Sequence, residues 1–372
     1  MPRRTRISPC VPATCSSSRN GSSDVGRALK PLDTTRVPVG ELARPPRPDL
    51  RVVALGGGTG LPTVLRGFRT ALFGSRPWDP ERDQTRLTAI ATVADDGGSS
   101  GKLRASYHLP SPGDIRSCLL ALAEGDPSMS DVFNFRFDGD GGVAGHSLGN
   151  LILTALTQLE RDFSKAVARG GRMLSIRGRV LPSTSQSVVL RAELSDGTVL
   201  EGESNIAGAR SPIRRLTLLP GDATALPEAR EALEVADLIV IGPGSLYSSL
   251  VAVLLVRDLA DSIARSRARV AFVMNLMTEP GETDRHTGVD HVMAIRRHAP
   301  TIPLHDVLVN TAPIATEQLD RYTAGGAAPV PPDVELLKAL GHTVVEGDLL
   351  AAGSEVRHDP AKLARALLAR IR

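Results

Sequence analysis

A chain of 372 residues can bury a large core, and its 41% hydrophobic and 23% charged residues are ordinary for a globular protein. No apolar run approaches the roughly 20 residues that a membrane-spanning helix needs, so we predict no membrane span. Residues 1–48 carry nine Lys or Arg residues against three acidic ones, a net charge of +6, whereas the whole chain carries +3. The remainder therefore stands at −3 and lacks the basic character expected of a protein that binds nucleic acid.

Residues 1–49 are predicted to form a disordered basic leader, because they are rich in Arg, Ser and Pro. They hold no apolar stretch typical of a secretory signal, although an organelle transit peptide is an alternative for an opening of this composition. The three cysteines show neither the spacing of a metal site nor that of a disulfide framework. We therefore expect a cytoplasmic protein.

From about Leu50 onward the pattern alternates between strands, glycine-rich loops and helices. Short runs of aliphatic and β-branched residues predict strands at 51–55, 87–94, 237–241, 269–276, 307–310 and 343–346. Apolar residues at helical spacing predict helices at 63–72, 115–123, 148–159, 227–235, 249–266, 291–298, 334–340 and 360–371. This order indicates an α/β fold with a mostly parallel, doubly wound sheet.

Residues 172–219 depart from this order, because polar and apolar residues alternate there with the period of a strand. The segment Ser195-Asp196-Gly197-Thr198 is a typical hairpin turn. We therefore predict one nucleotide-binding domain over residues 50–372 that carries a small β-rich insertion at about 172–219.

The first predicted strand ends in Gly56-Gly57-Gly58-Thr59-Gly60, and a helix follows. Bare backbone N–H groups at such a junction can approach a phosphate, and the helix dipole favours its negative charge. The spacing is neither the dinucleotide-binding fingerprint nor a Walker loop, since Leu61 stands in place of a further glycine and no Gly-Lys-Ser/Thr follows. A tight turn without a ligand is the alternative.

Two more loops are expected at the same edge of the sheet. Asp95 and Asp96 follow the second strand, where a carboxylate can hold a ribose hydroxyl or a Mg²⁺ ion. The alternative for at least one of them is a turn-forming or helix-capping role. Gly242-Pro243-Gly244-Ser245 follows a later strand, so the three loops predict a single cleft.

Three further polar residues are candidates for this cleft. Asn275 ends the strand that begins at Arg269 and could bind a base or a sugar. His146 and Asn150 flank a helix start, where His146 could act as a general base or serve as a hydrogen-bonded structural residue.

The segments VVALGGGTGLPTVLRG, TVADDGGSSGKLR, GHSLGNLIL, ADLIVIGPGSLYSSL and NLMTEPGET follow one another from residue 52 to residue 283. In sequence and in order they resemble the gluconeogenesis-factor (YvcK-like) branch of the CofD-like proteins. The resemblance extends from about residue 51 to the end of the chain. It implies a CofD-like Rossmannoid fold, binding of a UDP sugar such as UDP-N-acetylglucosamine, and a regulatory role in cell shape and carbon metabolism.

The resemblance also assigns residues to the ligand site. The ligand contacts that it implies are Gly57, Gly58, Thr59, Gly60, Asn150, Gly244, Ser245, Asn275, Thr278, Tyr322 and Arg357. Asp95 and Asp96 match the metal-binding position of the enzymatic relatives, which are 2-phospho-lactate transferases, and would be catalytic only in an enzyme. Three positions depart from the usual family pattern: Glu279 replaces Gln, Pro62 replaces Ser, and residues 253–255 replace Pro-Asn-Leu.

The leading hypothesis is a UDP-sugar-binding regulator that requires no cofactor, with Mg²⁺ as an option. It would act on an unidentified protein partner, and a homo-oligomer is left open. The alternative is a metal-dependent transferase that uses Asp95 or Asp96. An enzyme that binds a dinucleotide is a third hypothesis, which the incomplete glycine fingerprint disfavours.

Overall fold

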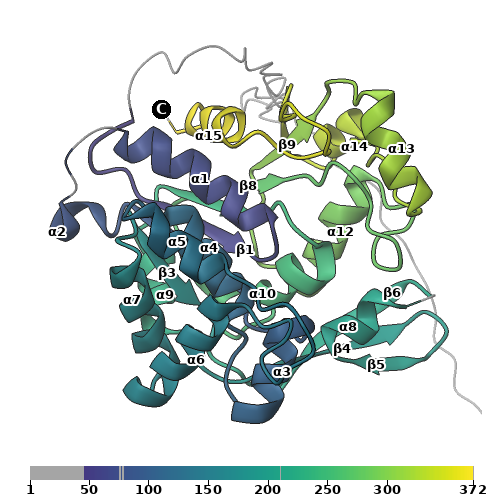
Figure 1. Ribbon diagram of the computed structural model, residues 1–372. Coiled ribbons are helices and arrows are strands. Elements are labelled where there is room, and N and C mark those ends of the chain that lie inside the picture. Colours follow the sequence, from purple (N-terminus) through teal and green to yellow (C-terminus); the bar gives the residue numbers. More distant parts are fainter. Residues whose placement is uncertain (1–45, 75–76, 78, 210, 372) are drawn as a thin grey trace, which may run out of the picture. The chain divides into compact units, whose positions relative to one another are not determined.

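A seven-stranded sheet lies at the centre of the computed structural model, and each of its strand pairs is parallel (Figure 1). The strands are β1 (Val52–Gly56), β2 (Leu87–Ala91), β3 (Arg179–Pro182), β7 (Leu238–Ile241), β8 (Arg269–Val273), β9 (Asp306–Asn310) and β10 (Thr343–Gly347). The structure describes residues 46–371 except 75, 76, 78 and 210. The predicted leader at 1–49 therefore lies outside the described residues, apart from its last four.

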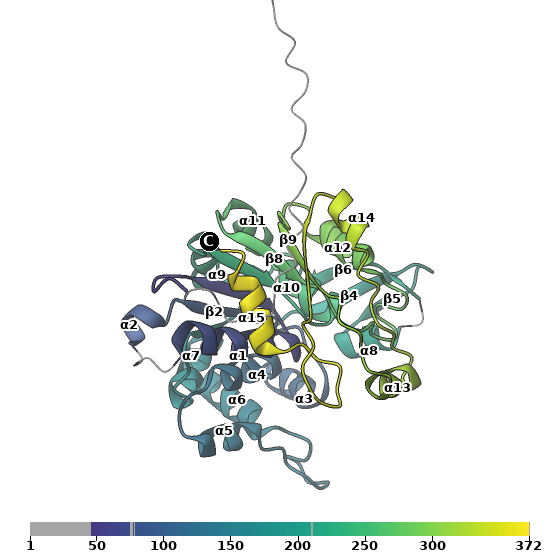
Figure 2. The ribbon, with the colours of Figure 1, turned by 90° about the horizontal axis from the view of Figure 1, so that it is seen from above.

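The chain builds this sheet outward from its centre in two directions, because the strand order is β10-β9-β8-β7-β1-β2-β3. Three helices on one face are α1 (Gly60–Phe73), α4 (Gly113–Leu122) and α15 (Pro360–Leu368). Three helices on the other face are α9 (Pro227–Glu234), α11 (Leu259–Arg265) and α12 (Gly288–His298). Figure 2 shows the two layers on either side of the strands. The predicted doubly wound α/β fold is confirmed.

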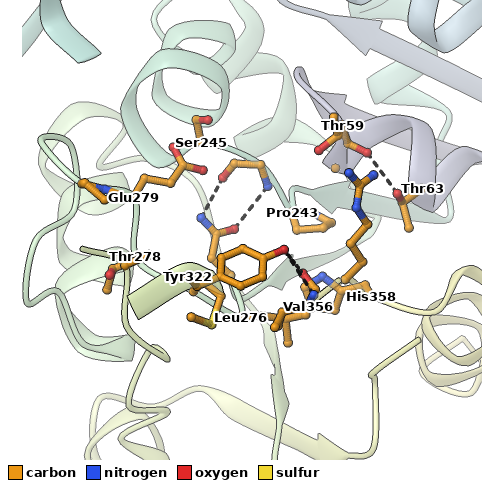
Figure 3. A pocket seen from close by; sticks show the side chains of 17 residues that line it. Thr59, Thr63, Pro243, Ser245, Leu276, Thr278, Glu279, Tyr322, Val356 and His358 are labelled. Carbon is orange, nitrogen blue, oxygen red and sulfur yellow. Dashed lines mark hydrogen bonds between the residues drawn. The ribbon is translucent and has the colours of Figure 1, made fainter. Parts of the chain in front are cut away.

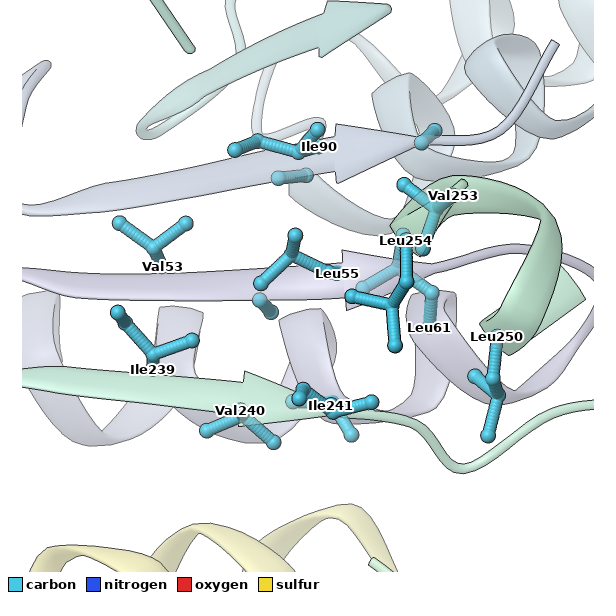
Figure 4. Close-up of a cluster of buried hydrophobic side chains, with 14 of the residues drawn as sticks. Val53, Leu55, Leu61, Ile90, Ile239, Val240, Ile241, Leu250, Val253 and Leu254 are labelled. Carbon is cyan, nitrogen blue, oxygen red and sulfur yellow. The ribbon is translucent and has the colours of Figure 1, made fainter. Parts of the chain in front are cut away.

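The central strands consist of continuous apolar runs because helices cover both of their faces. In the sheet register, Leu55 of β1 lies between Ile90 of β2 and Ile241 of β7, and all three side chains are fully buried. At the carboxyl ends of these strands, Leu61 and Leu250 extend the same core, as Figure 4 shows. This packing fixes the positions of the loops that leave β1 and β7.

A second sheet of three antiparallel strands forms the predicted insertion. Its members are β4 (Val189–Leu194), β5 (Val199–Glu201) and β6 (Ile213–Leu219), with the short helix α8 (Glu203–Ala207) between the last two. The hairpin turn is confirmed, since the Asp196 carboxylate accepts a hydrogen bond of 2.9 Å from the Thr198 N–H. The small sheet begins later than residue 172, because β3 pairs with β2 and belongs to the large sheet.

Several helices were not expected from the sequence. They are α2 (Pro80–Asp83), α3 (Gly98–Tyr107), α5 (Pro127–Asn134), α7 (Phe163–Met173) and α13 (Thr316–Ala324). α13 has only a short apolar face, Leu319 and Tyr322, and buries none of its residues fully, while α7 buries Gly170 and Gly171, which discourage a helical prediction. No helix in the described part of the chain is long and apolar enough to cross a membrane.

The predicted helix at 249–266 is interrupted. It consists of a wide π-helical turn, η1 (Leu246–Val251), a single turn, α10 (Ala252–Leu254), and α11. The predicted helices at 148–159 and 334–340 correspond to α6 (Leu148–Glu160) and α14 (Val334–Ala339). As at every helix start, the first N–H groups of η1 have no partner within the helix and are left for partners outside it.

We predict that Gly67→Ala destabilises the fold, because α1 and α15 pack without a side chain at this position. A Cβ atom at Gly67 would lie 2.0 Å from the Pro360 carbonyl oxygen. The expected loss is about 1–3 kcal/mol in the free energy of unfolding, measured by chemical denaturation. Thr70→Ala is the control, since Thr70 is exposed on the same helix and should change stability by less than about 0.5 kcal/mol. Equal stability of the two variants would contradict the packing described.

Candidate ligand-binding pocket

The sheet reverses its winding direction between β1 and β7, which are hydrogen-bonded neighbours. Loops that leave the carboxyl ends of two such strands diverge to opposite faces, and the crevice between them is the usual ligand site of open α/β sheets. In this chain those loops are residues 56–60 after β1 and residues 242–245 after β7. Both are the glycine-rich segments singled out in the sequence.

The loop after β1 contains glycines because the protein itself approaches its backbone. A Cβ atom on Gly60 would lie 2.1 Å from the Pro243 carbonyl oxygen of the neighbouring loop. A Cβ atom on Gly57 would lie 2.4 Å from a carboxylate oxygen of Asp114. Gly58 has a backbone φ of +58°, a conformation that favours glycine. The two loops can therefore lie in direct contact.

The first N–H groups of α1 have different partners. The Gly58 N–H donates a 3.0 Å hydrogen bond to the Asp114 carboxylate. The N–H groups of Thr59 and Gly60 donate no hydrogen bond to any residue that the structure describes. Because the helix dipole adds positive potential at this end, Thr59 and Gly60 are the donors available to an anion.

Asn275 holds the loop after β7 in place. Its side-chain oxygen accepts a hydrogen bond from the Gly244 N–H (3.2 Å), and its amide nitrogen donates to the Gly244 carbonyl (2.9 Å). The next residue, Ser245, has an N–H with no partner among the described residues. Asn275 was expected to contact a base or sugar, whereas in the structure its amide group fixes the Gly244 backbone.

A pocket of about 370 Å³ lies beside these two loops. Its lining includes eight of the predicted ligand contacts, namely Thr59, Gly60, Gly244, Ser245, Asn275, Thr278, Tyr322 and Arg357. Figure 3 shows Thr59 and Thr63 on the opposite side of the pocket from Thr278 and Glu279. The structure thus brings together residues that are almost 300 positions apart in the sequence.

The wall opposite the loops comes from the last third of the chain. The Tyr322 hydroxyl accepts a 3.2 Å hydrogen bond from the Val356 N–H, as Figure 3 shows. Thr278 is fixed to Ala328 by two hydrogen bonds, of 2.7 Å between backbones and 2.9 Å to its hydroxyl oxygen. Arg357 is half-exposed and forms an ion pair with Glu355. It is the one Lys or Arg side chain among the described lining residues.

His358 lines the pocket but was not identified from the sequence. Its side chain is buried, and burial lowers the pKa of the imidazole to about 4, so the ring is neutral near pH 7. The ring hydrogen-bonds to the Met274 backbone, while Nε2 has no hydrogen-bond partner among the described residues. A buried acceptor without a protein partner costs free energy, and Nε2 is such an acceptor.

A half-buried glutamate, Glu279, and a buried one, Glu282, lie at the Ser245 side of the pocket. Glu279 lines the pocket and hydrogen-bonds through its side chain to Ser245. The Glu282 carboxylate accepts hydrogen bonds from the N–H groups of Tyr247 (2.5 Å) and Ser248 (3.1 Å) at the start of η1. Burial raises the pKa of Glu279, and burial together with Glu279 raises that of Glu282 to about 7. The pair therefore holds a proton at pH values where carboxyl groups are ordinarily ionised.

Asp95 and Asp96 bind different parts of the protein. The Asp95 carboxylate accepts a 2.9 Å hydrogen bond from the Gly97 N–H, which makes it the predicted turn former. The Asp96 carboxylate accepts hydrogen bonds from the N–H (2.9 Å) and hydroxyl (2.8 Å) of Ser204 in α8. Neither residue lines the pocket. In the described part of the chain, no group of three or more His, Cys, Asp and Glu side chains is placed to hold a metal ion.

A carboxylate cluster surrounds Asp95 beneath the loop after β1. Burial and the charge of Asp95 raise the pKa of Asp114 to about 7, and the same two causes raise that of Glu203 to about 8. Asp114 is a residue that the sequence analysis missed, because its partner Gly58 is 56 positions away. Its carboxylate accepts the hydrogen bond of the Gly58 N–H, so this donor is not available to a ligand anion.

Asn150 belongs to a separate polar network. Its amide nitrogen donates to the Ser99 hydroxyl (3.2 Å), and its oxygen accepts from the Arg116 guanidinium (3.1 Å). His146 lies 3.1 Å from the same Ser99 hydroxyl, in agreement with a structural histidine. Asn150, Gly57 and Gly58 are the predicted contacts that the structure leaves out of the pocket lining.

Comparisons with known proteins point in one direction. The sequence profile of a family described as 2-phospho-L-lactate transferase CofD matches residues 52–350. The gluconeogenesis factor of Halalkalibacterium halodurans is 42% identical over 318 residues, which are 85% of this chain and 95% of that protein. The gluconeogenesis factor of Bacillus subtilis is 42% identical over 319 residues, 86% of this chain and 97% of that protein. A crystal structure of a UPF0052-family protein from Bacillus halodurans gives a TM-score of 0.80 at 41% identity, over 86% of this chain and 99% of that one.

Because of the Glu279–Glu282 pair, we predict that the stability difference between wild type and a Glu279 variant depends on pH. The folded protein keeps the pair protonated to higher pH than the unfolded chain does, so its free energy of unfolding falls as pH rises from about 4.5 to about 7. Glu279→Gln removes one of the two charges. Relative to wild type, this variant should gain thermal stability as pH increases through that window.

The control for this measurement is Glu317→Gln, an exposed glutamate on α13. Its melting temperature should follow that of wild type at every pH. Parallel melting curves for wild type and Glu279→Gln between pH 5 and pH 8 would contradict the buried pair.

Proposed function

Because this chain belongs to the CofD-like family and is 42% identical to gluconeogenesis factors over most of its length, we propose that it is a UDP-sugar-binding regulator. The expected ligand is UDP-N-acetylglucosamine. The site is the pocket at the carboxyl ends of β1 and β7, which offers places for a diphosphate, a base and a sugar. This function requires that the pocket bind the diphosphate of the ligand.

The observation that carries the proposal is a set of unused donors around one pocket. The N–H groups of Thr59, Gly60 and Ser245 have no partner among the described residues, and all three residues line the pocket with Arg357. Backbone N–H groups at a helix N-terminus suit phosphate oxygens, and a guanidinium adds a charge-assisted pair of hydrogen bonds. Two linked phosphates supply enough acceptor oxygens for these donors.

The rest of the pocket fits the uncharged parts of a sugar nucleotide. Leu276, Met277 and Val356 provide apolar surface next to the Tyr322 ring. His358 adds a neutral ring to the same lining. The volume of about 370 Å³ lies within the range of small-molecule sites.

Binding would act as a regulatory signal through the segments that the ligand joins. The pocket is built from the loops after β1, β7 and β8 and from Tyr322 and the 356–358 segment near the C-terminus. A ligand that contacts all of them favours the arrangement in which they lie together. We propose that a partner protein recognises this arrangement in the cytoplasm, and that cell shape and carbon metabolism respond to the supply of UDP sugar.

A phospholactyl-type transferase is the second candidate, since the matching family profile carries the name of that enzyme. It would require Mg²⁺ at Asp95 and Asp96. These carboxylates do not fit a metal ion as they stand, because each is engaged by backbone N–H or hydroxyl groups and the two point to different elements. We therefore derive no reaction step through a metal.

Calorimetric titration with UDP-N-acetylglucosamine tests the proposal. Wild type should bind the ligand without Mg²⁺ and in preference to GDP and NAD. Arg357→Gln should weaken binding about tenfold to a hundredfold, because a charged hydrogen bond contributes about 1.5–3 kcal/mol. Arg321→Gln is the matched control: Arg321 is exposed on α13 and does not line the pocket, so this variant should leave the affinity unchanged.

Two results would contradict this assignment. If UDP-N-acetylglucosamine fails to bind, or binds wild type and Arg357→Gln equally, the pocket is not the diphosphate site. If binding requires Mg²⁺ and disappears in Asp95→Asn, the transferase is the better description.

A further inference from the structure

A second hollow lies between the small sheet and α12, away from the pocket. We call it the arginine groove and define it by Arg214 and Arg215 of β6, Tyr247 of η1, and His286, Arg297 and His298 at α12 and just before it. Its volume is about 790 Å³. The groove shares no lining residue with the sugar-nucleotide pocket.

The groove carries excess positive charge. Three arginines line it against one carboxylate, Glu193, which already pairs with Arg214 at 2.8 Å. Arg215 and Arg297 are exposed and form no ion pair with a residue that the structure describes. Both lie close enough to His298 to add to the lowering of its pKa, which burial causes in the first place. Two guanidinium groups without an ion pair, one from β6 and one from α12, therefore line the same groove as this imidazole.

Other charged groups near the groove are engaged by the backbone. The Asp290 carboxylate accepts a 2.8 Å hydrogen bond from the Thr287 N–H, and the Asp284 carboxylate accepts one of 2.9 Å from the Gly281 N–H. They are not placed to neutralise Arg215 and Arg297 by ion pairing. The positive charge is thus available to a ligand.

Tyr247 gives a second, independent indication of a ligand. Its side chain is only 2% exposed, yet its hydroxyl makes no hydrogen bond with the described residues. Its ring lies edge-on to His286 and His298, at centroid distances of 6.2 and 5.9 Å. No group of the described residues satisfies this hydroxyl, so it is available to hydrogen-bond with a ligand oxygen in the groove that Tyr247 lines.

We propose that the arginine groove binds a small organic phosphate and that its occupancy is coupled to the sugar-nucleotide pocket. Two arginine forks and one phenol hydroxyl match the oxygens of a phosphate group, which offers acceptors in three directions. A groove of this volume suits a small molecule, whereas an extended acidic protein surface would make little contact with Tyr247, which is only 2% exposed.

Coupling follows from the segment that the two sites share. Gly244 and Ser245 line the pocket, and Tyr247, two residues later, lines the groove. The Tyr247 N–H is bound by Glu282, whose partner Glu279 lines the pocket. A ligand that moves or fixes Tyr247 thereby acts on the Ser245 N–H, and the effect is reciprocal. This coupling rests on the proposed function, whereas the phosphate site does not.

The groove also includes a contact between β6 of the small sheet and α12 beside the large sheet. The His298 ring accepts a hydrogen bond from the Leu216 N–H of β6 (3.0 Å) and donates one to the Ala294 carbonyl of α12 (2.8 Å). An anion that bridges Arg215 and Arg297 would strengthen this connection between β6 and α12. The small sheet would then be held more firmly when the groove is filled.

The test uses the whole chain and glycerol 2-phosphate as the probe. Calorimetric titration is done on wild type saturated with UDP-N-acetylglucosamine, so that the pocket cannot take the probe. The double variant Arg215→Gln/Arg297→Gln should bind the probe at least about tenfold more weakly than wild type. The control double variant Arg257→Gln/Arg265→Gln loses the same charge elsewhere on the surface and should bind like wild type.

Further arms separate the two halves of the proposal. Tyr247→Phe should weaken binding of the probe several fold and should leave the melting temperature of the protein at the wild-type value. The same titrations on Arg357→Gln, without sugar nucleotide, measure the affinity of the groove for the probe when the pocket lacks its arginine. This arm is informative even if the proposed function is wrong. In wild type, the probe should change the Kd of UDP-N-acetylglucosamine, and in the groove double variant it should not.

Three outcomes would overturn the inference. Equal binding of the probe to wild type and to the groove double variant would remove the site. Binding of an acidic poly-glutamate peptide without binding of the probe would mean that the groove is a protein-docking surface instead. A probe that binds the groove but leaves the sugar-nucleotide Kd unchanged would remove the coupling.

Discussion

The contact between the two glycine loops is the constraint on which the rest of the site depends. Gly60 at the start of α1 lies against the Pro243 carbonyl, at a distance that leaves no room for a Cβ atom. This contact places the N-terminus of α1 next to Ser245, so that donors from two loops serve one pocket. The parallel packing of β1 against β7 sets the spacing, because it fixes where each loop begins.

Buried carboxylates decide which backbone donors remain free. Asp114 occupies the Gly58 N–H, and Glu282 occupies the N–H groups of Tyr247 and Ser248. Burial raises the pKa of both carboxyl groups, which is the electrostatic cost of keeping them there. Thr59, Gly60 and Ser245, which line the pocket, keep N–H groups without a partner among the described residues. In the proposed function, a diphosphate in the pocket would meet these free donors at two adjoining helix starts.

Most of the fold could be predicted from the sequence, because central parallel strands and amphipathic helices leave periodic patterns. The buried runs of β1, β2 and β7 and the hairpin turn at Asp196 are examples. Short helices with few apolar residues, such as α13, left only a weak pattern. Strand β3 was placed in the wrong sheet, since its alternating residues resemble those of the insertion.

The sequence predicted which residues line the pocket better than it predicted what each of them does. Eight of the predicted contacts line the pocket, because glycine loops and polar residues at strand ends mark that edge of the sheet. Roles that depend on a distant partner could not be foreseen: Asp114 at Gly58 and Asn275 at Gly244 are pairings across 56 and 31 positions. His358 could have been suspected from the sequence, because it directly follows the predicted contact Arg357. Its unpartnered Nε2, however, is a property of the folded chain.

Backbone amide NMR during titration with UDP-N-acetylglucosamine tests the central claim most directly. The account predicts large shifts of the Thr59, Gly60 and Ser245 N–H signals, as each gains a phosphate oxygen as acceptor. The Gly58 signal should move far less, because its N–H stays on Asp114. If Thr59, Gly60 and Ser245 remain unchanged while the ligand binds, the diphosphate lies elsewhere and the account is contradicted.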